Sequence, residues 1–371
     1  MEEKNAPERD GSEPHGPMTI LDGATGVATE VAVGVAEQRR IVADLSLPRE
    51  ERIEAYEDII DSEVGDTNMS RGRNVERDIG LRQIFLKFEG GNPTGTQKDR
   101  IAFAQAKDAM RRGFDTFTVA TCGNYGVAAA LAASLAALRC IVYIPEQYTT
   151  RRTQEMEQLG ASIVRVPGDY EAAVTASRER ADRDEFYDAN PGGANISLQL
   201  SAYAGIANEI YDELRDAPAA VAVPVSNGTT LAGIYKGFLS LFRRGRTSRM
   251  PRLIAGSSYG KNPIINAFKN NLLLCEDLPP ETIRETNINE PLINWHSIDG
   301  NDALWAIRDT NGWADDAGDK AMLAYSKLLR DREGLHVLPA STAGLIALID
   351  YHKKTPLSND RYVVVLTGRR T

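Results

Sequence analysis

Hydrophobic and polar residues follow two regular patterns that alternate along most of the chain. Short, largely apolar runs are typical of buried strands, and longer segments with apolar residues three or four positions apart are typical of helices. The runs predict strands at residues 84–88, 114–121, 140–144, 162–166, 186–187, 220–225, 253–256 and 362–366. The periodic segments predict helices at about 98–112, 125–138, 150–159, 170–183, 196–214, 231–242, 316–332 and 342–353.

Strands that alternate with helices predict parallel sheets covered by helices on both faces, because a parallel connection has to cross the sheet. The expected fold class is therefore α/β. Ligands of such sheets bind beyond the carboxyl ends of the strands. The residues that follow each strand are consequently the first candidates for a functional site.

Three segments do not follow this alternation. Residues 1–17 are polar and lack the apolar stretch of a secretory signal, so residues 1–22 are expected to be a disordered leader. Residues 23–64 have helical spacing but no compact core, which predicts an arm lying on the body or on a neighbouring subunit. Residues 261–311 contain four prolines and no clear period, and no element is predicted there.

Composition narrows the class of protein. A chain of 371 residues is longer than one hydrophobic core normally supports, which predicts two domains or a large inserted lobe. The formal net charge of −9 argues against nucleic acid as the main partner, and no apolar run is long enough to predict a membrane span. Three separated cysteines favour a reducing compartment, and therefore the cytoplasm, and they predict no metal site.

The loop after the strand at 84–88 places a lysine at an unusual position. In Asn92-Pro-Thr-Gly-Thr-Gln-Lys98-Asp-Arg100, Lys98 falls in the first turn of a predicted helix. The positive end of the helix dipole and burial both lower the pKa of an ammonium group, which yields an amine that can attack an aldehyde or accept a proton. The alternative for this motif alone is a lysine that extends into solvent.

Two further polar loops connect a strand to a helix. The first consists of Thr121, Cys122, Gly123, Asn124 and Tyr125, and the second of Ser226, Asn227, Gly228, Thr229 and Thr230. Free backbone amides at a helix start suit a carboxylate in the first loop and a phosphate in the second. Taken alone, Asn124 is better explained as a helix cap, and the second loop is equally explained as a tight turn.

The last predicted strand runs into Thr367. A threonine at the end of a buried strand is commonly only a terminator. Here, however, it brings a neutral hydroxyl to the same edge of the sheet as the three loops. Four polar turns at one edge form a single site more readily than four unrelated features do.

Together these motifs resemble the fold type II pyridoxal-phosphate enzymes, the family of tryptophan synthase β, cysteine synthase and threonine synthase. The resemblance covers residues 83–371 and rests on the Lys98 motif, the two loops and Thr367, in family order and spacing. The motifs look most like those of threonine synthases and their relatives. The resemblance implies two lobes, each a mostly parallel twisted sheet flanked by helices.

The resemblance also implies roles for individual residues. Lys98 would form a Schiff base with pyridoxal 5'-phosphate and then transfer protons, and Asn124 would hydrogen-bond the ring hydroxyl. Thr367 would face the pyridine nitrogen. The cofactor phosphate would be held by Ser226, Asn227, Gly228, Thr229 and Thr230, and the substrate pocket would be lined by Thr121, Cys122, Gly123 and Tyr125.

The implied architecture has a small mobile domain, residues 100–188, that closes over the substrate. Residues 23–82 would form the arm and the start of the large domain, and residues 83–99 and 189–371 would complete the large cofactor-binding domain. Family members are typically dimers, so a homodimer is implied, with the arm as a candidate contact.

The implied function is a pyridoxal-phosphate-dependent amino-acid lyase or synthase of threonine synthase type, for example one that eliminates phosphate from O-phosphohomoserine and adds a nucleophile. A neutral hydroxyl beside the pyridine nitrogen makes the cofactor a weaker electron sink, which favours this chemistry over transamination. The alternatives are a cysteine synthase-like β-replacement on O-activated serine and a serine or threonine dehydratase. A cofactor-binding protein without turnover is disfavoured by the intact Lys98 motif.

Several positions depart from the family pattern and leave the substrate open. Gln97 stands where threonine synthases usually have an aromatic residue, Ser226 where glycine is usual, and Leu338 where many members have glutamate. Tyr125 stands where many members have a small hydroxyl residue, and it would either narrow the pocket or supply an acid. Candidates for binding an anionic leaving group are Arg100, Arg151, Arg152 and Arg249, and none of them is assigned.

Overall fold

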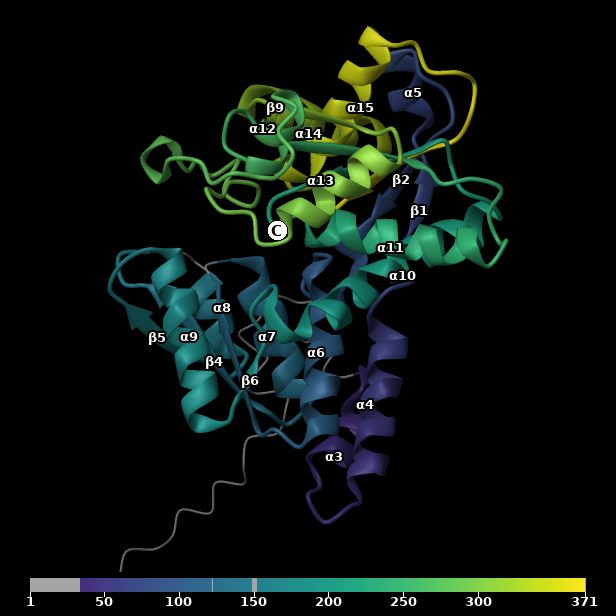
Figure 1. The fold of residues 1–371 in the computed structure, drawn as a ribbon. Helices are drawn as coiled ribbons and strands as arrows, with labels where there is room; N and C mark the ends of the chain where they lie inside the picture. Colours follow the sequence, from purple (N-terminus) through teal and green to yellow (C-terminus); the bar gives the residue numbers. More distant parts are fainter. Residues whose placement is uncertain (1–33, 122, 149–151, 371) are drawn as a thin grey trace, which may run out of the picture.

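The computed structural model of this chain describes residues 34–121, 123–148 and 152–370, which form two bodies, each built around one sheet (Figure 1). Helices flank both sheets, and strand pairs are parallel apart from one edge pair. The α/β class predicted from alternating strands and helices is confirmed.

The larger sheet has six strands. In order across the sheet they are β1 (Met69–Arg71), β2 (Ile84–Phe88), β10 (Tyr362–Leu366), β7 (Ala220–Pro224), β8 (Arg252–Ser258) and β9 (Trp313–Ala317). Val363 and Val365 of β10 belong to one hydrophobic core, and Tyr362 and Val364 belong to another. Because such a strand is buried on both faces, it appears in the sequence as a continuous apolar run.

Helices cover both faces of this sheet. The first core includes residues of α10 (Ile196–Leu214), α11 (Thr229–Arg243) and α13 (Gly300–Asp309), and the second includes residues of α5 (Arg73–Ile79), α14 (Asp319–Glu333) and α15 (Ala343–Lys354). Helix α12 (Pro263–Lys269) packs beside α13 and β9. Short 3-10 turns at Glu89–Gly91, Pro280–Thr282 and Pro339–Thr342 complete this body.

The smaller sheet has four parallel strands in the order β5 (Ser162–Val166), β4 (Arg139–Pro145), β3 (Thr116–Ala120) and β6 (Tyr187–Asp188). Around it lie α6 (Lys98–Arg112), α7 (Asn124–Leu135), α8 (Arg152–Gln158) and α9 (Tyr170–Asp184), with a 3-10 turn at Gly193–Asn195 (Figure 1). Helix α7 is almost wholly buried and rich in alanine, which allows its neighbours to approach closely.

The N-terminal helices α3 (Ala36–Ala43) and α4 (Arg49–Glu63) lie beside the smaller body, next to α6 (Figure 1). Tyr56 and Ile59 are fully buried there, and the Tyr56 hydroxyl donates a 2.9 Å hydrogen bond to the Ala132 carbonyl in α7. The described part of the arm thus packs on its own chain, against α6 and α7. The predicted leader, residues 1–22, and the first part of the arm lie outside the described residues.

Three local predictions need correction. The helix predicted from residue 316 is wrong at its start, because residues 313–317 form β9 and α14 begins at Asp319. Asp315 and Asp316 belong to this edge strand and form ion pairs with Lys269 of α12. Because these residues are charged, the strand does not appear in the sequence as an apolar run. The region 261–311 contains α12 and α13, and Pro263 occupies the first turn of α12, where its missing N–H costs nothing. The elements β1 and α5 were not predicted.

The strand order explains why distant loops meet. Strand β10 lies between β2 and β7 and is parallel to both. The carboxyl ends of these three strands are therefore adjacent, which brings the loops after Phe88, Pro224 and Leu366 together at one edge of the sheet.

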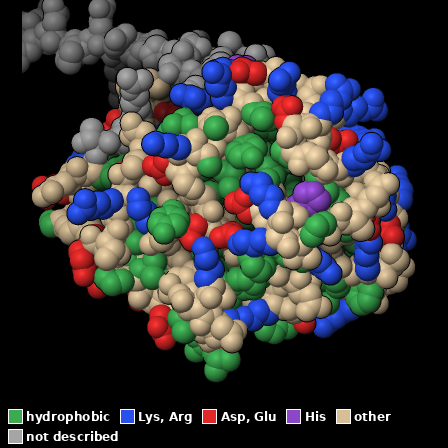
Figure 2. All heavy atoms as spheres, turned by 90° about the horizontal axis from the view of Figure 1, so that it is seen from above, with side chains coloured by type: hydrophobic (Ala, Val, Ile, Leu, Met, Phe, Trp, Pro, Cys, Tyr) green, Lys and Arg blue, Asp and Glu red, His purple; other side chains and the backbone are tan. Residues whose placement is uncertain are grey.

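The surface seen from above in Figure 2 mixes basic, acidic and hydrophobic side chains. Among the helices of the described segments, none is long and apolar enough to cross a membrane. Within the same segments, no three His, Cys, Asp or Glu side chains are grouped so that they could hold a metal ion.

Candidate active site

Lys98 is the first residue of α6 and is fixed next to the end of β10. The Gln97 amide donates a 3.0 Å hydrogen bond to the Thr367 carbonyl, and Thr96 forms an isolated bridge with Gly368. The side chain of Gln97, at the cap position, makes no capping hydrogen bond, and the Lys98 amide donates a 3.2 Å hydrogen bond to the Thr96 hydroxyl. The positive end of the helix dipole therefore acts on the Lys98 ammonium group.

The Lys98 amine lines a cavity, and its nitrogen makes no hydrogen bond or ion pair within the part of the chain that the structure describes. It lies 5.8 Å from the centre of the Tyr125 ring. Burial lowers the pKa of Lys98 to about 8, and the Asp299 carboxylate opposes this shift. A substantial fraction of the amine is consequently neutral near pH 7 to 8, and the alternative of a lysine extending into solvent is not what the structure shows.

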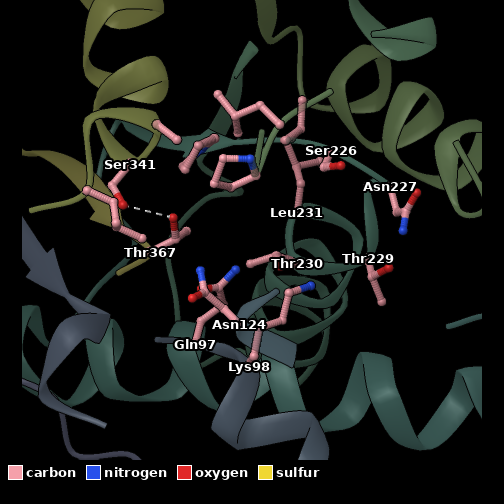
Figure 3. Close-up of a pocket in the computed structure, with 17 residues that line it drawn as sticks. Gln97, Lys98, Asn124, Ser226, Asn227, Thr229, Thr230, Leu231, Ser341 and Thr367 are labelled. Atoms are coloured by element: carbon pink, nitrogen blue, oxygen red, sulfur yellow. Dashed lines mark hydrogen bonds between the residues drawn. The ribbon is translucent and has the colours of Figure 1, made fainter. Parts of the chain in front are cut away.

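An inner cavity with about 620 Å³ of unfilled space lies where the three loops meet (Figure 3). Lys98 and Asn124 reach it from the side of α6 and α7, Thr367 faces it from the end of β10, and Ser341 faces it from the 3-10 turn Pro339–Thr342. The remaining polar wall is the loop of Ser226, Asn227, Gly228, Thr229 and Thr230. The cavity thus brings together the predicted lysine, asparagine, threonine and glycine-containing loop.

The loop before α11 has the form of an anion site. Helix α11 begins at Thr229 without a side-chain cap, which leaves its first backbone amides, at residues 229–231, available beside the cavity. Gly228 has φ +95°, and a Cβ there would lie 2.7 Å from the Asp299 carbonyl oxygen, so only glycine fits. The Thr229 hydroxyl donates a hydrogen bond to the Asp299 carboxylate, which stands behind the loop.

The region without a predicted element holds this loop in place. Asn262 donates a 2.9 Å hydrogen bond to the Ser226 carbonyl, and Asn294 donates a 2.8 Å hydrogen bond to the Asn227 side chain. The Asp299 amide donates to the Asn227 carbonyl at 3.0 Å. Sequence reasoning missed all three residues, because polar residues in an irregular segment carry no periodic signal.

Thr367 closes the inner cavity at the end of β10. Its hydroxyl lies 3.2 Å from the Ser341 hydroxyl, which also accepts a 3.0 Å hydrogen bond from the Gly368 amide (Figure 3). Leu338, one of the family departures, lies in the same wall. Among the described residues, the groups that line this end of the cavity are therefore neutral.

Asn124 begins α7, and Gly123 rather than Asn124 occupies the cap position. The Asn124 side chain makes no hydrogen bond within the described segments and lines both the inner cavity and a second, outer one. The alternative in which Asn124 caps its helix is thus not observed. Thr121 and Gly123 also line the outer cavity, and Cys122 lies outside the described residues.

Tyr125 presents its ring to the outer cavity and buries its hydroxyl. The hydroxyl donates a 2.6 Å hydrogen bond to the Ala189 carbonyl and accepts one of 2.5 Å from the Gln105 amide. Burial raises the pKa of Tyr125 well above its ordinary value. Of the two roles that the sequence left open, the structure favours a ring that narrows the pocket over an acid.

The outer cavity has about 1480 Å³ of unfilled space and shares Lys98, Asn124, Ser226 and Asn227 with the inner one. It is lined from both bodies, by residues after β3 and β4, at the start of α9, and in the irregular segment 280–296. Its carboxylates are those of Asp169, Glu171, Glu285 and Glu290. None of these four was singled out in the sequence.

The candidate arginines for an anionic leaving group do not reach either cavity in the described chain. Arg100 is buried between Glu89 and Glu209, and Arg249 forms a two-bonded pair with Asp360. Arg152 lies 2.7 Å from Glu155 in α8, and Arg151 lies outside the described residues. Arg100 thus has a structural role that its place in the lysine motif did not reveal.

Comparison with known proteins agrees with this geometry. Residues 60–368 match the family model described as "Pyridoxal-phosphate dependent enzyme". The threonine synthase of Methanocaldococcus jannaschii is 28% identical over 305 residues, covering 82% of this chain and 74% of the relative. The threonine synthase of a Synechocystis species is 30% identical over 302 residues, covering 80% and 73%.

A solved structure of similar fold is that of maize serine racemase, with a TM-score of 0.72 and 17% identity over 86% of this chain and 92% of the racemase. At that identity the likeness concerns the fold alone. The predicted fold type II architecture, the pyridoxal 5'-phosphate cofactor and the assignment as a lyase of this group are confirmed. The chain belongs to the pyridoxal-phosphate dependent enzyme family.

Proposed function

We propose that the two cavities form one active site, in which pyridoxal 5'-phosphate on Lys98 serves a lyase that removes a substituent from the β- or γ-carbon of an amino acid and adds a nucleophile. This is the type of reaction that the name threonine synthase describes in the relatives. The observation that carries the proposal is the Lys98 amine, its pKa lowered to about 8, facing the uncapped start of α11.

The chemistry of the cavity walls fits the parts of the cofactor. The free amides at the start of α11 suit its phosphate, and the side chain of Asn124 suits the ring hydroxyl. The Thr367 hydroxyl, held by Ser341, suits the pyridine nitrogen without adding charge. The partly neutral Lys98 amine suits the aldehyde.

The bound cofactor supplies an electron sink that makes the α-proton of an amino acid acidic. The chain supplies the rest. Lys98 takes the proton from the α-carbon and returns it there. Thr121 and Gly123, with the start of α7, offer groups that bind and orient the substrate carboxylate. The Tyr125 ring limits the space beside Lys98 and excludes water from it.

Cofactor attachment tests the first half of the proposal. Purified protein should show the absorbance of lysine-bound pyridoxal phosphate, and borohydride reduction should fix the cofactor mass to the peptide that contains Lys98. Lys98→Ala should lose both signals. Lys107→Ala, on the exposed side of the same helix, should keep them. A Lys98→Ala protein that retains full activity would falsify the proposal.

Substrate choice tests the second half. The holoenzyme should be screened with O-phosphohomoserine, O-phosphoserine, O-acetylserine, serine and threonine, following the cofactor spectrum and the released phosphate, acetate or keto acid. Phosphate and threonine from O-phosphohomoserine identify a threonine synthase. Cysteine formed from O-acetylserine or O-phosphoserine with sulfide identifies the β-replacement alternative, and keto acid formed from serine or threonine identifies a dehydratase.

We further propose that residues 100–188 move as a small domain that closes over the substrate, because the outer cavity is lined from both bodies. A homodimer and a cytoplasmic location complete the proposal. Light scattering during size exclusion tests the dimer. Cys140 and Cys275 are free thiols in the structure, which is compatible with a reducing compartment.

A further inference from the structure

Glu290 extends from the larger body into the outer cavity and meets the smaller body there. Its Oε1 accepts a 3.4 Å hydrogen bond from the Tyr148 hydroxyl, which follows β4. The same oxygen lies 3.3 Å from the position that a Cβ on Gly123 would occupy. The carboxylate therefore faces the loop that leads into Asn124, in the cavity that also contains the Lys98 amine.

The surroundings of Glu290 make it a better proton acceptor than an ordinary glutamate. Burial and the nearby Glu285 carboxylate raise its pKa. The Tyr148 hydrogen bond and the positive charge of Arg152 oppose the increase. Of the four carboxylates that line the outer cavity in the described chain, Glu290 is the most deeply enclosed.

Other titratable groups near the site are committed elsewhere. The Tyr125 hydroxyl is bound to Ala189 and Gln105 and turns away from the cavity. The Asp299 carboxylate accepts a hydrogen bond from the Thr229 hydroxyl in the loop of residues 226–230. His296 is paired with Asp277 at 2.8 Å on the exposed rim. Among the described groups, this leaves Glu290 as the enclosed carboxylate on the substrate side of Lys98.

We propose that Glu290 is the general base for the nucleophile that replaces the departing group, a role separate from that of Lys98 at the α-carbon. This inference rests on the proposed elimination and replacement. When water is the nucleophile, one O–H bond breaks and its proton passes to the Glu290 carboxylate while the oxygen bonds to the unsaturated substrate carbon. The electron pair of the C=C bond ends in a new C–H bond at the α-carbon, with the proton supplied by Lys98. Glu290 then returns its proton to solvent.

The test measures how the reaction divides between two outcomes. With O-phosphohomoserine, replacement by water yields threonine, whereas elimination without replacement yields 2-oxobutyrate and ammonia. Glu290→Gln keeps the size and the hydrogen-bonding capacity of the side chain but cannot accept the proton. We expect its holoenzyme to release phosphate near the wild-type rate while replacement falls by about 100-fold or more.

Glu281→Gln is the matched control, because Glu281 lies in the same irregular segment but is exposed and lines neither cavity. It should divide products as the wild type does. Glu290→Asp withdraws the carboxylate by one methylene and should give an intermediate division, which keeps the test decisive if Glu290→Gln binds no cofactor.

Three results would overturn the inference. An unchanged division in Glu290→Gln or Glu290→Asp would show that the carboxylate takes no part in replacement. An equal loss of elimination and replacement, with the cofactor still bound, would assign Glu290 to positioning instead. If the loaded wild type turns over none of the amino acids in the screen, the proposed function itself fails, and this distinguishes its failure from that of the Glu290 assignment.

Discussion

Replacing Arg100 with alanine should destabilise the protein far more than replacing Arg249, although each arginine forms a two-bonded pair with a carboxylate. Arg100 donates to Glu89 at 2.6 and 2.9 Å and to Glu209 at 2.6 and 2.8 Å. Lys87 also contacts Glu209, so two cations and two carboxylates balance inside the protein. The cluster joins β2, α6 and α10, and Lys98 stands two residues before Arg100.

The magnitude follows from burial. The Arg100 side chain is 5% exposed and that of Glu89 is 0% exposed, whereas the side chains of Arg249 and Asp360 are 39% and 25% exposed. Removing one member of a buried ion pair leaves an uncompensated charge and costs about 3–5 kcal/mol. Breaking a pair near the surface costs at most about 1 kcal/mol.

Urea unfolding of the cofactor-free proteins, followed by fluorescence and circular dichroism, measures both losses. A cost below about 1 kcal/mol for Arg100→Ala, or a cost equal to that of Arg249→Ala, would refute the reasoning. Arg100→Ala should also reduce cofactor loading, because the first turn of α6 loses its ion pairs with Glu89 and Glu209. Arg249→Ala should load normally, since its pair with Asp360 lies apart from both cavities.

The same cluster predicts a pH dependence. Arg100 and Lys87 outweigh burial and lower the pKa of Glu209 from 4.5 to about 2. A depressed carboxyl pKa stabilises the folded state above the unfolded value, and that stabilisation is lost as the pH falls from about 4.5 to about 2. Without Arg100 the folded-state pKa of Glu209 rises toward 4.5. Arg100→Ala should therefore lose less additional stability over this interval than the wild type does.

Three further predictions concern single positions. A pKa of about 8 leaves roughly a fifth of Lys98 neutral at about pH 7.4, against roughly a thousandth for an ordinary lysine. The rate of cofactor uptake by the cofactor-free protein should therefore rise up to pH 8 and then level off, and a rise that continues to pH 10 would contradict the lowered pKa. Tyr125→Phe keeps the ring but leaves the Ala189 carbonyl without its 2.6 Å donor, so the free energy of unfolding in urea should fall by about 1–2 kcal/mol. The cofactor spectrum should stay unchanged, and a shifted spectrum would mean that the hydroxyl acts on the site. Gly256→Ala would place a Cβ 2.0 Å from a backbone oxygen at the start of α15 and should destabilise the folded protein by about 3 kcal/mol or more. Gly318 has open space around it, so Gly318→Ala should change stability little, and equal thermal stability of the two variants would disprove the close packing.

The sequence was most informative where strands are buried on both faces. Apolar runs predicted eight of the ten strands in the described residues within a few residues, and the polar loops after three of them supplied Lys98, Asn124 and Ser226. Because parallel strands end at a common edge of the sheet, these loops could be predicted to lie near one another even though the order of the strands was unknown. That inference did not require knowing which strands are neighbours.

The sequence was least informative where a residue acts through an irregular segment. Asn262, Asn294 and Asp299 hold the loop of residues 226–230, and Glu290 enters the outer cavity, yet all four lie in a region without a period. Their positions depend on tertiary contacts with Ser226, Asn227 and Tyr148, which no local pattern encodes. Proline and asparagine show that such a segment is irregular, but not what it touches.

Tyr125 and Thr367 show where the boundary between the two cases lies. Thr367 follows a strand, and the strand order alone, with β10 between β2 and β7, carries its hydroxyl to the Lys98 loop. The orientation of Tyr125 depends instead on an acceptor at Ala189, far away in the chain. The position of a side chain that follows from the strand order can therefore be predicted from sequence. An orientation that depends on the hydrogen-bond partner of one hydroxyl cannot. The outer cavity, which Tyr125, Tyr148 and Glu290 line, belongs to the second kind.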